Sequence, residues 1–148
     1  SVSSLHPFIT HFPIALITAA TVMQFIVLIH PNWMDKRAPI WIFGFSLAMS
    51  FSSMLSGQAA ANIAISESGL GEPAQALMAQ HENFATFTVW TSLVVLIGWL
   101  WLYFRFPDNR RVDLVVLAFL ILLTVAVVFT GYFGGELVMR YGVGVGQL

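Results

Sequence analysis

The chain has 148 residues, of which 58% are hydrophobic and only 9% are charged, and its formal net charge is −1. A water-soluble domain usually carries about a quarter charged residues, so this composition predicts an integral membrane protein whose solvent is the lipid bilayer. The six basic residues are too few for a nucleic-acid-binding stripe. The absence of cysteine excludes disulfides, thiolate-bound metals, iron–sulfur clusters and c-type haem attachment.

Four apolar segments follow one another, each close to the roughly 20 residues that cross the hydrocarbon core as a helix. We expect helices over about residues 7–30, 39–65, 73–106 and 112–138, the third being strongly apolar from Phe84. Backbone groups find no water in lipid, so the spans must be helical, and short connections make neighbours antiparallel. The predicted fold is all-α: one domain, residues 1–148, folded as an integral membrane up-down-up-down four-helix bundle.

The basic residues predict the orientation of this bundle. Lys36 and Arg37 lie between the first and second segments; Arg105, Arg110 and Arg111 lie between the third and fourth. The positive-inside rule assigns both loops to the cytoplasm, which makes both termini periplasmic in a bacterial inner membrane. Residues 1–5 lack the basic region of a cleavable signal peptide, so we expect the first segment to remain as a span.

Polar side chains collect at the outer, periplasmic end of the predicted bundle. They are His6, His11, Gln58, Asn62, His81, Glu82, Glu136, Arg140 and Tyr141. Glu136 precedes Arg140 by four residues, which is the spacing of an ion pair on one helix face. Any chemistry in this chain is therefore expected at its outer end.

Helical spacing relates two of the histidines to small residues. His11 shares a face of the first helix with Ala15, Thr18 and Val22, and His81 shares a face of the third with Ala85, Thr88 and Ser92. We expect both faces to point inward. The second helix carries Ala48, Ser52, Ser56 and Ala60, and the fourth carries Gly131-x-x-x-Gly135 beside Gly134. Such small-residue ridges allow close helix approach or leave a slot for a flat group.

Motifs at both ends of the chain resemble a known family. They are Leu5-His6-Pro7 with His11-Phe12-Pro13-Ile14-Ala15-Leu16, the histidine opening the third helix, and Gly134-Gly135-Glu136-Leu137-Val138 with Arg140-Tyr141-Gly142-Val143-Gly144-Val145. The chain is similar over nearly its whole length to the bacterial membrane proteins called domain of unknown function twenty-two thirty-one. The resemblance implies a four-helix inner-membrane domain and names no activity.

The first functional hypothesis is a b-type haem, which needs only axial ligands and an apolar slot. The first and third helices run in the same direction and lie diagonally, so His11 and His81 would face each other as the ligands. Gly131 and Gly135 would border the ring, and Arg140 would meet a propionate. His11 lies about five residues, or roughly 7 Å, deeper than His81, which makes His6, level with His81, a rival ligand.

The predicted function is electron transfer near the periplasmic face, between a quinol or membrane redox partner and a periplasmic carrier, alone or within a larger respiratory complex. Two alternatives remain open. A copper or zinc site would use His6, His11 and His81 with Glu82 or Glu136, although rings five residues apart diverge by about 140° on a regular helix. A cofactor-free subunit of a membrane complex is the other. No catalytic set is found in the sequence, and His30 has no inner partner.

Overall fold

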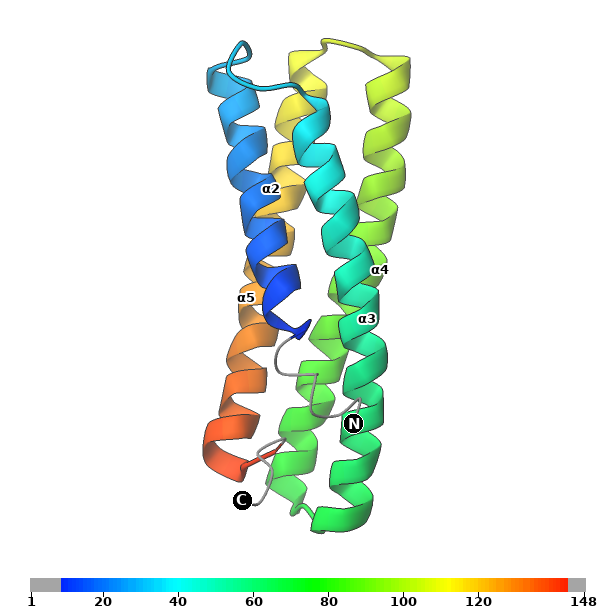
Figure 1. Ribbon diagram of the computed structural model, residues 1–148, viewed down its shortest axis with the longest axis vertical. Helices are drawn as coiled ribbons and strands as arrows, with labels where there is room; N and C mark the ends of the chain where they lie inside the picture. Colours follow the sequence, from blue (N-terminus) through cyan, green and yellow to red (C-terminus); the bar gives the residue numbers. More distant parts are fainter. Residues whose placement is uncertain (1–8, 144–148) are drawn as a thin grey trace.

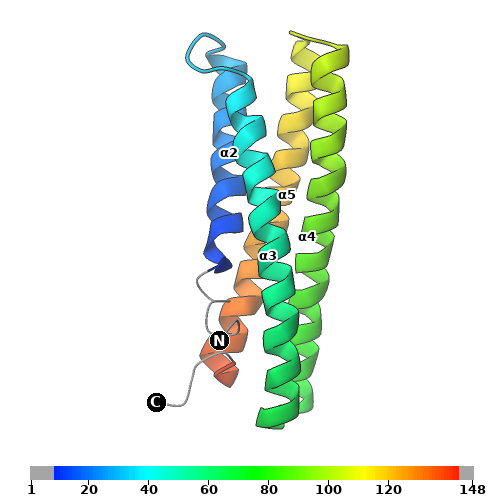
Figure 2. The same cartoon turned by 45° about the vertical axis from the view of Figure 1, so that its right-hand side comes forward.

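The computed structural model describes residues 9–143, except for the side chains of residues 64, 67 and 68. Four antiparallel helices make up the bundle: α2 (His11–Ile29), α3 (Arg37–Ser68), α4 (Glu72–Arg105) and α5 (Arg110–Tyr141). Figures 1 and 2 show α2 packed between α3 and α5, and α4 packed between the same two neighbours. All four helices are long and apolar enough to cross a membrane. The all-α four-helix prediction and the diagonal relation of α2 and α4 are confirmed.

Local chemistry sets the helix ends. Pro73 occupies the first turn of α4, where its missing N–H costs nothing. The side chain of Asn109 accepts the backbone N–H of Arg111 at 2.9 Å and caps α5. Gly69 and Gly142 end α3 and α5 in the left-handed region. With these caps, α5 begins at Arg110 and ends at Tyr141, so it extends past both ends of the expected range of about residues 112–138.

The helices differ in length, and this difference organises the molecule. The helix α2 has 19 residues, whereas α3, α4 and α5 have 32, 34 and 32. At 1.5 Å per residue the longer helices reach about 50 Å, against roughly 30 Å of hydrocarbon core. We call the end with the α2–α3 and α4–α5 loops the basic end. At the opposite, terminal end α3, α4 and α5 continue well past the start of α2 (Figure 1).

Two clusters of apolar side chains stabilise the two parts of the bundle. The larger cluster joins all four helices in the basic half and contains Ile17, Ala20, Ile40, Phe43, Trp99, Val116, Leu120, Leu123 and Val127. Among the described residues, the smaller cluster joins α3, α4 and α5 through Ala61, Met78 and Leu137. Exposed amides and hydroxyls, such as Gln58, Asn62 and Gln75, lie around the smaller cluster. The terminal end is therefore a three-helix extension with polar flanks, which suits the membrane interface.

The inward face predicted for α2 is wrong. His11, Ala15, Thr18 and Val22 are all exposed, and the buried side of α2 carries Pro13, Ile17, Ala20, Gln24, Val27 and Leu28. Because nearly every position of this span is apolar, spacing alone does not indicate which face packs inward. The face predicted for α4 is confirmed, since Thr88 and Ser92 are buried. On α3 Ser56 is the one buried member of the expected ridge. Ser46 and Ser50, which lie outside that ridge, are buried as well.

Gly131 allows α2 to approach α5 closely. A Cβ at this position would lie 3.1 Å from Cδ1 of Ile14, whereas a Cβ on Gly135 would meet nothing within 4 Å. Gly131 therefore packs against a neighbouring helix, and Gly135 faces outward. Of the small-residue ridge expected on α5, Gly131 allows close helix approach and Gly135 does not contact a neighbouring helix.

Gly131→Val should destabilise the bundle by about 1–3 kcal/mol, because the added methyl groups must displace Ile14. Gly135→Val makes the same chemical change without a neighbour and is the matched control. Thermal unfolding in detergent, followed by circular dichroism, measures the difference. Equal midpoints for the two variants would show that the α2–α5 approach is not tight at Gly131.

Candidate functional site

His81 is the one predicted ligand that the described part of the chain holds in a defined geometry. It lies on the inward face of α4, partly buried, and its Nδ1 atom is 2.9 Å from the backbone carbonyl oxygen of Thr130 on α5. A carbonyl oxygen only accepts, so Nδ1 carries the proton and donates it. In the neutral form of the ring Nε2 is then an acceptor, and Nε2 makes no hydrogen bond within residues 9–143.

Gly134 makes room for this ring. A Cβ on Gly134 would lie 3.1 Å from Cε1 and 3.3 Å from Nδ1 of His81. The ring therefore packs directly on the backbone of α5, one turn after Thr130. Packing and hydrogen bond together hold the imidazole in one orientation, which is how proteins commonly hold a histidine that binds a metal through its other nitrogen.

The structure does not bring His11 to His81. His11 is exposed in the first turn of α2, on the side of that helix away from the core. The contact of Ile14 with Gly131 and the hydrogen bond between Thr21 and Thr124 place the first turn of α2 at about the level of Gly134, on which the His81 ring packs. The two histidines therefore lie at similar heights and differ in the helix face that they occupy. His6 lies outside the described residues. The ring of His81 is thus placed at about the level of the start of α2, where the three-helix extension begins.

Arg140 and Glu136 form the expected pair, with Arg140 Nε 2.6 Å from a Glu136 carboxylate oxygen. The guanidinium is two-thirds exposed, whereas Glu136 is largely covered. The pair neutralises the carboxylate near the end of α5, and the guanidinium has edges left for a second acidic group.

A metal centre finds limited support in the described residues. Within residues 9–143 no group of three histidine, aspartate or glutamate side chains is close enough to hold a metal ion. Glu82 is exposed, and Glu136 is engaged by Arg140. A copper or zinc site of the kind predicted from the sequence would therefore need His6.

The basic end holds an ion cluster that the sequence did not predict. Lys36 lies 3.1 Å from Asp108 and 3.3 Å from Asp113 (Nζ to carboxylate oxygen), which joins the α2–α3 loop to the α4–α5 loop and to the first turn of α5. Gln24, buried in α2, donates to the backbone carbonyl of Asp113 at 3.1 Å. Sequence reasoning used Lys36 only as an orientation charge. The signal in the sequence that could have indicated this cluster is a pair of acidic residues, Asp108 in the α4–α5 loop and Asp113 in the first turn of α5.

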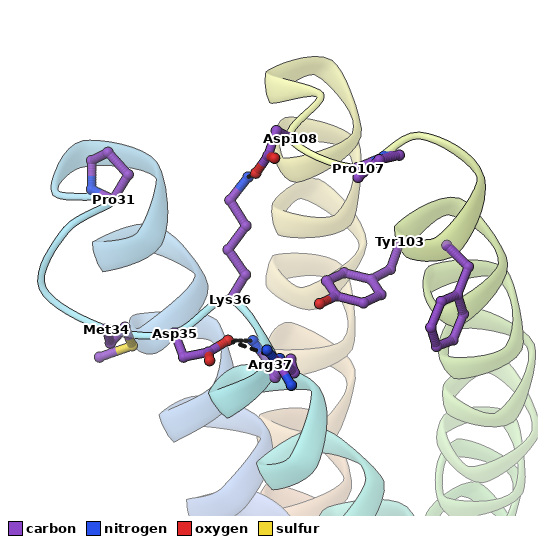
Figure 3. Close-up of a pocket in the computed structure, with 9 residues that line it drawn as sticks. Pro31, Met34, Asp35, Lys36, Arg37, Tyr103, Pro107 and Asp108 are labelled. Carbon is purple, nitrogen blue, oxygen red and sulfur yellow. Dashed lines mark hydrogen bonds and ion pairs between the residues drawn. The ribbon is translucent and has the colours of Figure 1, made fainter.

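Desolvation lowers the pKa of Lys36, but the hydrogen bond to Asp108 and the charge of Asp113 outweigh it, and the pKa is raised above 10.5. Lys36 therefore stays cationic at any physiological pH. Beside it lies a pocket of about 530 Å³ between the two loops (Figure 3). The basic end thus combines a fixed charge network with an open space.

Comparison with known proteins identifies one relationship. A family model described as "Predicted membrane protein (DUF2231)" matches residues 3–147. No curated protein and no solved structure matches the chain. The match covers both terminal motifs and His81, in agreement with the resemblance drawn from the sequence.

Gly134→Val should lower the unfolding midpoint and destabilise the bundle by about 1–3 kcal/mol, because the His81 ring cannot stay on α5 beside the new side chain. In a His81→Ala background the same change should cost much less, which a double-mutant cycle measures. Gly135→Val in both backgrounds is the control for helix propensity. An equal cost of Gly134→Val with and without His81 would contradict the packing described here.

Proposed function

Because the chain belongs to the predicted membrane protein family DUF2231, whose description assigns no activity, we propose a function from the geometry of the terminal end. The protein is a multi-pass inner-membrane haem protein that holds one b-type haem beside the three-helix extension. His81 is its fixed axial ligand, and an N-terminal histidine, His6 or His11, is the second. The group would carry electrons between a membrane redox partner, such as a quinol, and a periplasmic carrier.

The orientation of His81 is the observation that carries this proposal. A neutral imidazole whose Nδ1–H is bonded to a backbone carbonyl presents the lone pair of Nε2 to iron. The ring needs no reorganisation to bind. A histidine that served only the packing of α4 on α5 would not require a free nitrogen at a partly buried position.

The unequal helix lengths support the same placement. The ring of His81 lies at about the level of the first turn of α2, and α2 is diagonal to α4. A flat group bound to His81 would therefore lie between α3 and α5, where the described residues beyond the start of α2 include no fourth helix. Arg140, exposed at this end, suits a propionate. The exposed face of His11 favours His6 as the second ligand.

A cofactor-free role in a membrane complex is the second candidate, and exposed aromatic side chains favour it. Trp41, Trp90, Trp101 and Phe104 project from α3 and α4. Large exposed apolar surfaces mark sites of protein or membrane contact. Such a subunit would be colourless when pure.

The absorption spectrum of the full chain, purified from cells supplied with haem, tests the cofactor. We expect a Soret band, an α-band that changes on reduction, and their loss in His81→Ala. His30→Ala is the matched control, because His30 stacks on Trp33 at the basic end and should keep the spectrum. Loss in His6→Ala but not in His11→Ala would identify the second ligand. A colourless protein, with or without added haemin, would contradict the haem proposal and leave the structural role.

The proposed orientation has an independent test, because the chain has no cysteine. A single Glu72→Cys substitution at the first residue of α4, beside the α3–α4 loop, should react with a membrane-impermeant maleimide from the periplasmic side. Asn32→Cys in the α2–α3 loop should react only after the inner membrane is opened, since the positive-inside rule places that loop in the cytoplasm. The reverse pattern would overturn the orientation and leave the bundle intact.

A further inference from the structure

The pocket at the basic end has walls of two kinds. Its volume is about 530 Å³, and it is lined by Pro31, Met34, Asp35, Lys36, Arg37, Tyr103, Phe104, Pro107 and Asp108. Figure 3 shows Lys36 extending toward Asp108 on one side, Arg37 beside Asp35 below, and Tyr103 directed from α4 toward the space between the loops. Polar groups of both signs and an apolar wall therefore border one space.

The charges of this lining are balanced. Lys36 is already paired with Asp108 and with Asp113 behind the pocket. Arg37 faces Asp35 through Nε at 3.4 Å and is two-thirds exposed, which leaves its terminal amino groups available. A simple anion would meet as many carboxylates as cations here. A ligand with an anion and a cation a few ångströms apart matches both.

The depth of the pocket indicates where such a ligand comes from. Trp33, Trp41, Trp101 and Phe104 are exposed around the basic end. Exposed tryptophans of membrane helices gather at the level of the lipid headgroups. The pocket therefore opens where phospholipid headgroups lie, and its apolar wall adjoins their acyl chains.

We propose that this pocket binds the headgroup of a phospholipid with a primary ammonium group, namely phosphatidylethanolamine. The phosphate lies against the guanidinium of Arg37 and the hydroxyl of Tyr103, because guanidinium matches phosphate geometry. The ammonium donates to the carboxylates of Asp108 and Asp35. A choline headgroup lacks those N–H donors, and a glycerol headgroup lacks the positive charge. The site is independent of the proposed haem.

Native mass spectrometry of the full chain in detergent tests the proposal, with phosphatidylethanolamine, phosphatidylcholine and phosphatidylglycerol of identical acyl chains as probes. The ethanolamine lipid should bind about tenfold more tightly than either of the others, as expected for one added charge-assisted hydrogen bond. Arg37→Gln should remove this preference. Arg111→Gln loses the same charge at an exposed position outside the lining and should retain it.

Asp108→Asn gives a sharper result, because it removes a carboxylate from the lining and leaves Lys36 paired with Asp113. Selectivity should shift toward phosphatidylglycerol, while helical content by circular dichroism stays that of the wild type. Soluble phosphoethanolamine should compete poorly, since it lacks the chains that the wall contacts. Equal binding of the three lipids, an unchanged selectivity in Asp108→Asn, or competition by phosphoethanolamine at the affinity of the lipid would each overturn the proposal.

Discussion

The contact between His81 and α5 is the constraint on which the account of the terminal end depends. One hydrogen bond to the Thr130 carbonyl and the close approach of the ring to Gly134 fix the position of the imidazole between two helices. The carbonyl accepts this proton in addition to its place in the helix, so the Nδ1–H of His81 has a partner. The consequence is a ring with one nitrogen committed to structure and the other left for a ligand.

The length of α2 gives this ring its surroundings. Since α2 is 13 residues, or about 20 Å, shorter than α3, the described part of the bundle changes from four helices to three near the start of α2. The four-helix part carries the larger apolar core, and the three-helix part carries the smaller one. At the opposite end, Lys36 joins the two loops through Asp108 and Asp113. Each end of the molecule therefore has its own polar chemistry, separated by an apolar interior.

Sequence reasoning predicted the helices because each span is long, apolar and bounded by loop residues, and it predicted the Glu136–Arg140 pair because four-residue spacing is a local property. It failed for α2, where uniform apolarity conceals the packed face, so His11 proved exposed. The partners of His81 and Lys36 depend on the register of α4 against α5 and on the path of two loops. Such relations involve residues some 50 to 80 positions apart, and local spacing does not contain them. The family match agrees with the fold and adds no activity.

The tautomer of the His81 ring is the property on which the proposed ligand site depends, and it can be measured directly. Nitrogen-15 NMR of the histidine-labelled chain in lipid bilayers, with His81 assigned by comparison with His81→Gln, reports which ring nitrogen carries the proton. In the neutral form of the ring we expect a proton on Nδ1, coupled to the labelled Thr130 carbonyl, and an unprotonated Nε2. A proton on Nε2, or an Nδ1 with no coupling to Thr130, would contradict it.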